Sequence, residues 1–185
     1  MSIAVNTYDG PIRLVLFDVD GVLTDGSLVF DGAGEALKIF HVRDGLAVSL
    51  LRAHGIRTGV LSGKESDPLD FRVRQLNFDV AMTGRLDKAD ALESICHQEG
   101  MDRMAVAYAG DDVVDLPLAG IVGRFYAPSD AHPLVLRRAD HVLQAHGGRG
   151  AAREMAEHVL MSGGLSLEQA YEPLLNQWER FDVVQ

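Results

Sequence analysis

The sequence has little of several features that would define other classes of protein. Its single cysteine, Cys96, excludes an internal disulfide. With 17 basic and 27 acidic residues the formal net charge is -10, which argues against nucleic acid or an anionic membrane surface as the main partner. No apolar run approaches the roughly 18 residues of a membrane span. The amino terminus lacks the basic and then apolar pattern of a signal peptide. We therefore expect a cytoplasmic protein.

The order of apolar segments indicates the fold. Short apolar runs, typical of buried strands, alternate with segments of helical period, and 185 residues fit one domain spanning 1–185. This predicts an α/β fold, a Rossmann-like three-layer sandwich with a mainly parallel sheet. We expect strands at 12–17, 56–61, 78–82, 105–109, 123–127 and 141–143. We expect helices at 45–53, 67–76, 87–99, 113–120, 131–138, 149–161 and 167–181. The last helix follows a capping box at 166–169, within a helical tail of about 165–185.

One segment interrupts this alternation. Apolar runs at 28–30 and 36–40 flank a turn with two glycines, Asp31-Gly32-Ala33-Gly34-Glu35, which predicts a β-hairpin over about 27–41. The hairpin directly follows the first strand. It should therefore project beside the carboxyl end of that strand, where open α/β sheets bind ligands.

A pair of carboxylates, Asp18 and Asp20, leaves the first strand directly after Phe17. A carboxylate can attack phosphorus, and a second acid can protonate the leaving alkoxide. Both would need a cation to lower the repulsion between aspartate and phosphate. A solvated acidic loop is the simpler explanation of a lone pair, but the apolar strand before it and Gly-Val-Leu-Thr after it disfavour that explanation.

Three further signals follow other predicted strands. Gly110-Asp111-Asp112 and Asp115 offer the carboxylate oxygens that suit Mg²⁺, although acids also favour helix N-termini. Ser62, followed by Gly63, could bind phosphate through its hydroxyl and the neighbouring amides. Lys88 begins a predicted helix, where a cation opposes the helix dipole. Taken singly, the last two are explained as well by a strand-end turn and a solvated lysine.

The four motifs together, in this order and spacing, resemble those of the haloacid dehalogenase superfamily over about 12–161. A finer resemblance is to the 3-deoxy-D-manno-octulosonate 8-phosphate phosphatase group, in which a hairpin replaces a large cap. It is carried by the segments 20–26, 42–45, 130–133 and 147–151. The resemblance implies Mg²⁺ as cofactor, a sugar-acid phosphate as substrate, and a homotetramer. In such tetramers the hairpins form a barrel, and each site is covered by a neighbouring subunit.

The resemblance also assigns roles to residues. Asp18 would be the nucleophile and a metal ligand, and Asp20 the acid/base residue that also gives a backbone carbonyl to the metal. Asp111 would be the third protein ligand, with Asp112 in the metal set and Asp115 in support. Ser62 and Lys88 would hold phosphoryl oxygens as further catalytic residues. The implied substrate-binding residues are Asp20, His41, Val42, Arg43, Asp44, Gly45, Gly63, Lys64, Arg72, Lys88 and Arg149.

Two positions depart from the pattern of that group. Lys64 stands where an arginine is expected after Ser-Gly, and Ser49 stands where an arginine is expected after Arg-Asp-Gly. Lysine lacks the bidentate fork that matches a carboxylate or phosphate, and serine removes the charge. The sugar acid therefore stays open between an eight-carbon ulosonate 8-phosphate and a nine-carbon acylneuraminate or nonulosonate 9-phosphate.

Two other classes share some of these features. A phosphoacceptor signalling domain also combines an aspartate, a Ser/Thr and a lysine, but Asp20 would promote turnover and argues against it. A non-catalytic assembly domain is disfavoured because every motif residue is present.

Overall fold

A computed structural model describes residues 8–182, with side chains from 8 to 179. Within this part the chain forms a six-stranded parallel sheet in the order β5-β4-β1-β6-β7-β8. The strands are β1 (Leu14–Phe17), β4 (Arg57–Leu61), β5 (Val80–Met82), β6 (Val106–Ala109), β7 (Arg124–Ala127) and β8 (His141–Val142). The predicted α/β fold with a parallel sheet is confirmed. Residues 1–7 and 183–185 lie outside the described residues, and with them the two ends of the predicted domain, the amino-terminal segment judged for a signal peptide and the end of the helical tail.

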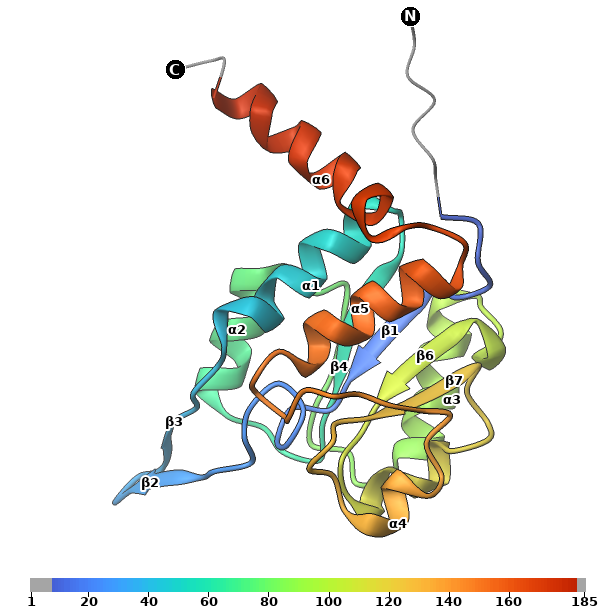
Figure 1. Cartoon of the computed structure of the whole chain (residues 1–185). Coiled ribbons are helices and arrows are strands. Elements are labelled where there is room, and N and C mark those ends of the chain that lie inside the picture. The colour runs from blue at the N-terminus through green and yellow to red at the C-terminus, as the bar shows by residue number, and fades with distance from the viewer. Residues whose placement is uncertain (1–7, 183–185) are drawn as a thin grey trace, which may run out of the picture.

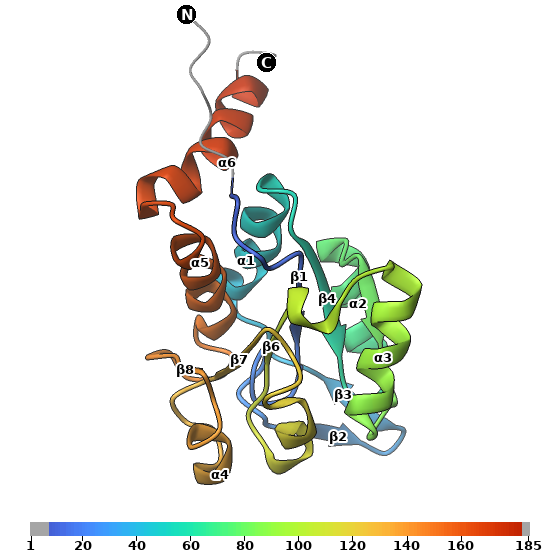
Figure 2. The same ribbon diagram turned by 90° about the vertical axis from the view of Figure 1, so that its right-hand side faces the viewer.

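Helices cover both faces of the sheet (Figures 1 and 2). On one face lie α1 (Val42–Ala53), α2 (Asp67–Leu76), α5 (Ala151–Ser162) and α6 (Leu167–Asp182). On the other lie α3 (Lys88–Glu99), α4 (Pro133–Leu136) and the 3-10 helices η1 (Arg103–Ala105) and η2 (Val113–Leu118). The central strand β1 is buried on both faces, with Val15 and Phe17 in one apolar core and Leu14 and Leu16 in the other.

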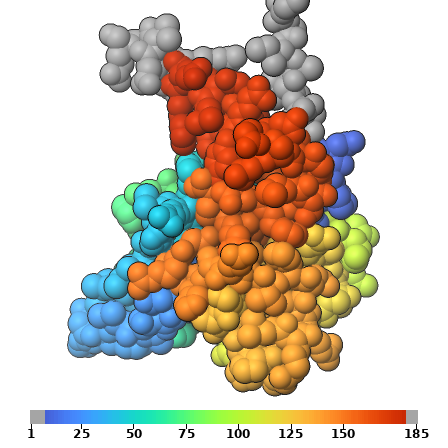
Figure 3. Space-filling model, viewed as in Figure 1, coloured from blue at the N-terminus to red at the C-terminus, as the bar shows by residue number. Residues whose placement is uncertain are grey.

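The predicted hairpin is also confirmed. β2 (Val29–Asp31) and β3 (Gly34–Leu37) form a separate antiparallel pair. The Asp31 carboxylate accepts hydrogen bonds from the backbone N–H groups of Ala33 at 2.7 Å and Gly34 at 3.2 Å, which holds the turn. The hairpin projects from the end of the molecule opposite α6, as the ribbon and the space-filling view both show (Figures 1 and 3).

Three predicted helices differ in extent. α1 begins at Val42 instead of 45, because the His41 side chain accepts a hydrogen bond from the Arg43 N–H and caps the helix three residues earlier. The helix predicted at 113–120 is the shorter 3-10 helix η2, which contains Pro117 and therefore lacks one backbone donor. The helix predicted at 131–138 spans only Pro133–Leu136.

The carboxy-terminal helix starts as predicted. Ser166 and Gln169 exchange side-chain hydrogen bonds with each other's backbone N–H groups, at 2.7 and 3.3 Å, and form the expected capping box. Among the described residues, no helix combines the length and the apolarity that a membrane crossing requires. The assignment of 1–185 to a single domain stays a prediction.

Candidate active site

A cleft of about 320 Å³ opens at the carboxyl ends of β1, β4 and β6. Parallel strands end at the same sheet edge, so residues far apart in the sequence meet there. Asp18 follows β1, Ser62 follows β4, and Asp111 follows β6. The cleft is lined by Asp18, Asp20, Gly26, Ser62, Gly63, Lys64, Leu86, Lys88, Asp111, Asp112 and Val114. The structure therefore brings together the residues of all four sequence motifs.

Lys88, the first residue of α3, is the charged centre of the site. Its ammonium lies 2.7 Å from Asp18 Oδ2 and 2.5 Å from Asp115 Oδ1, and it donates to the Tyr108 hydroxyl at 2.8 Å. Burial alone would lower the pKa of Lys88, but the Asp18 and Asp115 carboxylates outweigh it and raise that pKa above the ordinary lysine value. Lys88 is therefore a permanent cation, although only 1% of it is exposed.

Asp115 organises this end of the cleft. Its Oδ1 accepts from Lys88 and from the Tyr108 hydroxyl at 2.6 Å, and its Oδ2 accepts from the backbone N–H groups of Asp111 at 2.9 Å and Asp112 at 3.1 Å. Gly110 is required here, because a Cβ at that position would lie 2.4 Å from the Asp115 carboxyl carbon. Both oxygens of Asp115 are engaged within the protein, so its role is to fix the loop that carries Asp111.

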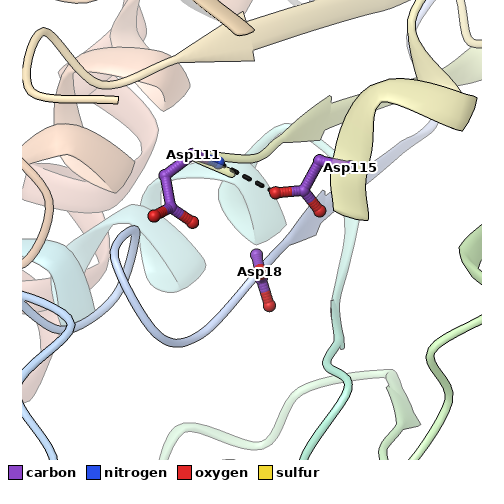
Figure 4. Close-up of side chains that lie close together, drawn as sticks. All are labelled: Asp18, Asp111 and Asp115. Carbon is purple, nitrogen blue, oxygen red and sulfur yellow. Dashed lines mark hydrogen bonds between the residues drawn. The ribbon is translucent and has the colours of Figure 1, made fainter. Parts of the chain in front are cut away.

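Asp18 and Asp111 line the cleft, and Asp18 accepts a hydrogen bond from the Val19 N–H on Oδ1 at 2.7 Å while its Oδ2 contacts Lys88. Oxygens of Asp18, Asp111 and Asp115 all lie within 4.8 Å of one another (Figure 4). Asp111 Oδ1 is buried and has no hydrogen-bond partner in the structure. Burial, followed by the negative charges of Asp18, Asp115 and Asp112, raises the pKa of Asp111 to about 8. Burial likewise raises the pKa of Asp18 to about 6, against the opposing effect of Lys88.

This donor set fits a hard divalent cation. Mg²⁺ in proteins is usually held by one or two carboxylates together with phosphate and water oxygens. Asp18 and Asp111 supply such oxygens, and a cation between them would relieve the repulsion that raises their pKa values. Asp112 lines the same cleft, but its Oδ1 accepts from the Val113 N–H at 2.7 Å and caps η2. The three-carboxylate cluster contains Asp115 and not Asp112, and the assignment of Asp112 to the metal set stays a prediction.

Ser62 and Lys64 line the same cleft. Ser62 is 2% exposed, and its hydroxyl accepts a hydrogen bond from the Lys64 N–H at 3.2 Å. The Ser62 N–H donates to the Met82 carbonyl oxygen at 2.9 Å, which ties this turn to β5. The hydroxyl is thus held at the edge of the cleft beside Lys88, where an anion can be bound.

The expected sugar-side residues do not line this cleft. Val42, Arg43, Gly45 and Arg72 line a separate hollow of about 400 Å³, and Arg43 and Arg149 line another of about 440 Å³. His41 caps α1. Asp44 is 3% exposed and accepts from the backbone N–H groups of Gly150, Ala152 and Arg153, which holds the start of α5 against α1. Among the described residues, those expected on the sugar side therefore lie outside the cleft that contains Asp18, Lys88 and Asp111.

Two residues at the site had no role assigned from the sequence. Tyr108 donates to Asp115, and its signal was an aromatic residue with a polar tip inside a buried strand. Lys38, from the hairpin, contacts Asp20 Oδ1 at 2.6 Å. Its only signal was a single cation within the apolar run 36–40.

Comparisons with known proteins agree with this geometry. The sequence pattern of the haloacid dehalogenase-like hydrolases matches residues 71–155. The 3-deoxy-D-manno-octulosonate 8-phosphate phosphatase KdsC of Haemophilus influenzae is 44% identical over 155 residues, which cover 84% of this chain and 86% of that protein.

Solved structures of similar proteins share the whole fold. The cobalt-bound deoxy-D-mannose-octulosonate 8-phosphate phosphatase of Haemophilus influenzae superposes with a TM-score of 0.81, covering 83% of this chain and 90% of that one at 44% identity. The Moraxella catarrhalis 3-deoxy-D-manno-octulosonate 8-phosphate phosphatase, in complex with a magnesium ion, a phosphate ion and a KDO molecule, has a TM-score of 0.82 at 28% identity and covers 91% and 94%.

The fold and site thus define a phosphoric monoester hydrolase of the haloacid dehalogenase type. Given the identity and coverage above, the chain belongs to the 3-deoxy-D-manno-octulosonate 8-phosphate phosphatase family.

Proposed function

We propose that this chain hydrolyses 3-deoxy-D-manno-octulosonate 8-phosphate through an aspartyl-phosphate formed on Asp18. One observation carries the chemistry: the Asp18 carboxylate lines the cleft together with Asp20 and lies 2.7 Å from the buried Lys88 ammonium. The substrate is inferred from the relatives, whose names give this phosphatase activity.

The reaction divides into two displacements. In the first, an Asp18 oxygen attacks phosphorus, the bond from phosphorus to the sugar oxygen breaks, and Asp20 donates its proton to that oxygen. In the second, Asp20 takes a proton from water, the water oxygen attacks phosphorus, and the bond to Asp18 breaks to release phosphate. Lys88 and Ser62 stabilise the charge on the transferring group. Asp18 and Asp111 would hold Mg²⁺, which would supply the positive charge that offsets repulsion between aspartate and phosphate.

The proposed active unit is a homotetramer. The cleft of one chain lacks the expected sugar-side residues, whereas His41 to Gly45, Arg72 and Arg149 lie outside it. The hairpin exposes large apolar side chains, including Phe30 at 64% and Ile39 at 66%. Both observations support a neighbouring copy that covers the hairpin and completes the site. The cytoplasmic location expected from the sequence stays a prediction.

The alternative activity and the alternative substrate are not equally supported. A phosphoacceptor signalling domain is disfavoured, because the chain belongs to a phosphatase family and presents Asp20 in the same cleft as Asp18. The nine-carbon substrate stays open because two residues replace expected arginines: Lys64, which lines the cleft, and Ser49, which lines the neighbouring hollow.

Phosphate release from a panel of substrates tests the proposal. We would compare the eight-carbon 8-phosphate, a nine-carbon 9-phosphate and a common hexose 6-phosphate, each with Mg²⁺ and with a chelator. We expect Mg²⁺-dependent release, with the highest kcat/KM for the eight-carbon compound. A higher kcat/KM for the nine-carbon compound would reassign the substrate. Release that persists without divalent metal would contradict the mechanism.

A further inference from the structure

Lys38 is a buried cation at the base of an exposed hairpin. It follows the last residue of β3, Leu37, and its side chain is 0% exposed, whereas its neighbour Ile39 is 66% exposed. Its ammonium reaches away from the hairpin to the cleft and lies 2.6 Å from Asp20 Oδ1. The hairpin therefore places one positive charge against Asp20, two residues after the proposed nucleophile Asp18.

Two carboxylates hold the Lys38 ammonium. Besides Asp20, it lies 2.6 Å from Glu35 Oε1 on β3. Burial alone would lower the pKa of Lys38, but its hydrogen bonds to Asp20 and Glu35 raise that pKa above the ordinary value. The Lys38 ammonium is thus held in its charged form against two carboxylates, Asp20 and Glu35.

The contact constrains one oxygen of Asp20 and leaves the other free. Within residues 8–182, the hydrogen bonds to this carboxylate both end on Oδ1, from Lys38 and, at a longer 3.5 Å, from the Thr24 hydroxyl. A carboxylate held on one oxygen keeps its plane and direction, so Oδ2 is presented in a fixed position. Proton transfer needs a heavy-atom distance of about 2.6–3.2 Å, so this orientation matters for catalysis.

We propose that Lys38 is the positioning residue for Asp20: it fixes Oδ1 so that Oδ2 faces the ester oxygen that leaves and the water that attacks. This role rests on the proposed function of Asp20 as the acid/base residue. It gives the hairpin a direct part in catalysis within its own chain. A lysine that only anchors the hairpin is the competing explanation.

Leaving-group dependence separates the two explanations. An alkyl leaving group such as a sugar alcohol needs a proton as its bond to phosphorus breaks, whereas p-nitrophenolate leaves readily without one. A misplaced Asp20 should therefore slow a sugar phosphate much more than p-nitrophenyl phosphate. A merely loosened hairpin should slow both substrates alike.

The variants are Lys38→Met, which keeps the length of the side chain and removes its charge, and Lys38→Arg, which restores the charge. For Lys38→Met we expect kcat on the sugar phosphate to fall by about 10- to 100-fold, part of the 10²–10⁴ that acid–base catalysis contributes. We expect KM to change by less than about 3-fold and p-nitrophenyl phosphate turnover to fall by less than about 3-fold. Lys38→Arg should recover most of the lost kcat, since a charged donor again holds Oδ1.

The matched control is Glu35→Gln, which removes the other ionic contact of Lys38 and leaves its contact with Asp20. We expect kcat within about 3-fold of the wild type. Thermal melting establishes that each variant is folded, and Lys38→Gln, a neutral donor, replaces Lys38→Met if that variant is not. Equal losses on both substrates, or wild-type rates for a folded Lys38→Met, would overturn the role. A wild-type chain that hydrolyses neither substrate would instead overturn the proposed function itself.

Discussion

The phosphate side of the site and the β-hairpin are neighbours built on opposite principles. Asp18, Ser62, Lys88 and Asp115 are each at most 7% exposed, and every one follows or contacts a strand or helix of the core. The hairpin contributes no buried apolar residue, and Phe30 and Ile39 are 64% and 66% exposed. The residues on the phosphate side are held by contacts within one chain, whereas the hairpin leaves its large apolar side chains exposed.

Because of this difference, the two regions should respond differently to mutation. The charges at the strand ends are held by core elements and should survive changes elsewhere in the molecule. The hairpin has its turn, its two-strand ladder and the Lys38 contact to hold it, and an isolated two-stranded hairpin is marginal in water. Attack by Asp18 should therefore depend on the core, whereas the positioning of Asp20 by Lys38 and the completion of the sugar side should depend on the hairpin. The following changes test that division, from the largest expected effect to the smallest.

Asp18→Asn should abolish turnover while leaving the fold intact. An amide cannot act as the nucleophile that forms the aspartyl-phosphate, and the neighbouring Asp115 is engaged on both of its oxygens. Phosphate release and far-UV circular dichroism measure the two outcomes. Asp9→Asn, at an exposed position outside the cleft, is the control and should retain full activity. Normal turnover by Asp18→Asn would remove this residue from the mechanism.

Lys88→Met should cost stability as well as activity. It leaves the Asp18 and Asp115 carboxylates buried without their cation, and breaking a buried ion pair from one side costs about 3–5 kcal/mol. Chemical denaturation measures the loss in the free energy of unfolding. The matched control is Lys64→Met: that lysine is exposed, so we expect a change within about 0.5 kcal/mol. Similar losses for the two variants would show that Lys88 is not the charged centre of a buried network.

Mg²⁺ should stabilise the folded chain through Asp111. A ligand at about 100 times its Kd adds about 2.7 kcal/mol to the free energy of unfolding. Asp111→Asn should lose most of this gain, because it removes the carboxylate whose buried oxygen has no partner in the protein. Asp112→Asn should keep it, since asparagine also caps a helix and Asp112 serves η2. Thermal melts with and without Mg²⁺ decide the matter. A larger loss of Mg²⁺ stabilisation for Asp112→Asn than for Asp111→Asn would indicate that Asp112 is a metal ligand.

The division also sets what the sequence could predict. The strands and helices of the core can be predicted from the period and composition of the sequence, and the motif residues come after the ends of strands. The sequence could therefore predict the strand within 12–17, the helix at 67–76 and the proximity of Asp18 to Asp111. Contacts that depend on where a side chain points in the packed fold could not be predicted. Lys38 belongs to an exposed hairpin, and nothing local indicates that its ammonium turns inward to Asp20.

The same limit explains why the hydrogen-bond partners of Asp44 and Asp112 could not be predicted. Their residue types suit a binding site, and their neighbours match the motifs, but each carboxylate satisfies backbone N–H groups at the start of a helix. Which donors surround a carboxylate is a property of the packed chain. The period of the sequence could not distinguish a ligand from a cap.

The hairpin variant Phe30→Ser, Ile39→Ser should change the core least. Both side chains are largely exposed and support no core residue, so we expect the free energy of unfolding, measured at high dilution, to change by less than about 0.5 kcal/mol. In a homotetramer the same change removes apolar contact area between copies, and the mass in solution should fall toward the 20.1 kDa of one chain. Light scattering measures this mass. Met104→Ser, at a 56% exposed position on η1, is the control and should leave the mass unchanged. An unchanged mass for the hairpin variant would show that the hairpin is not the interface, and the sugar side of the site would then need another source.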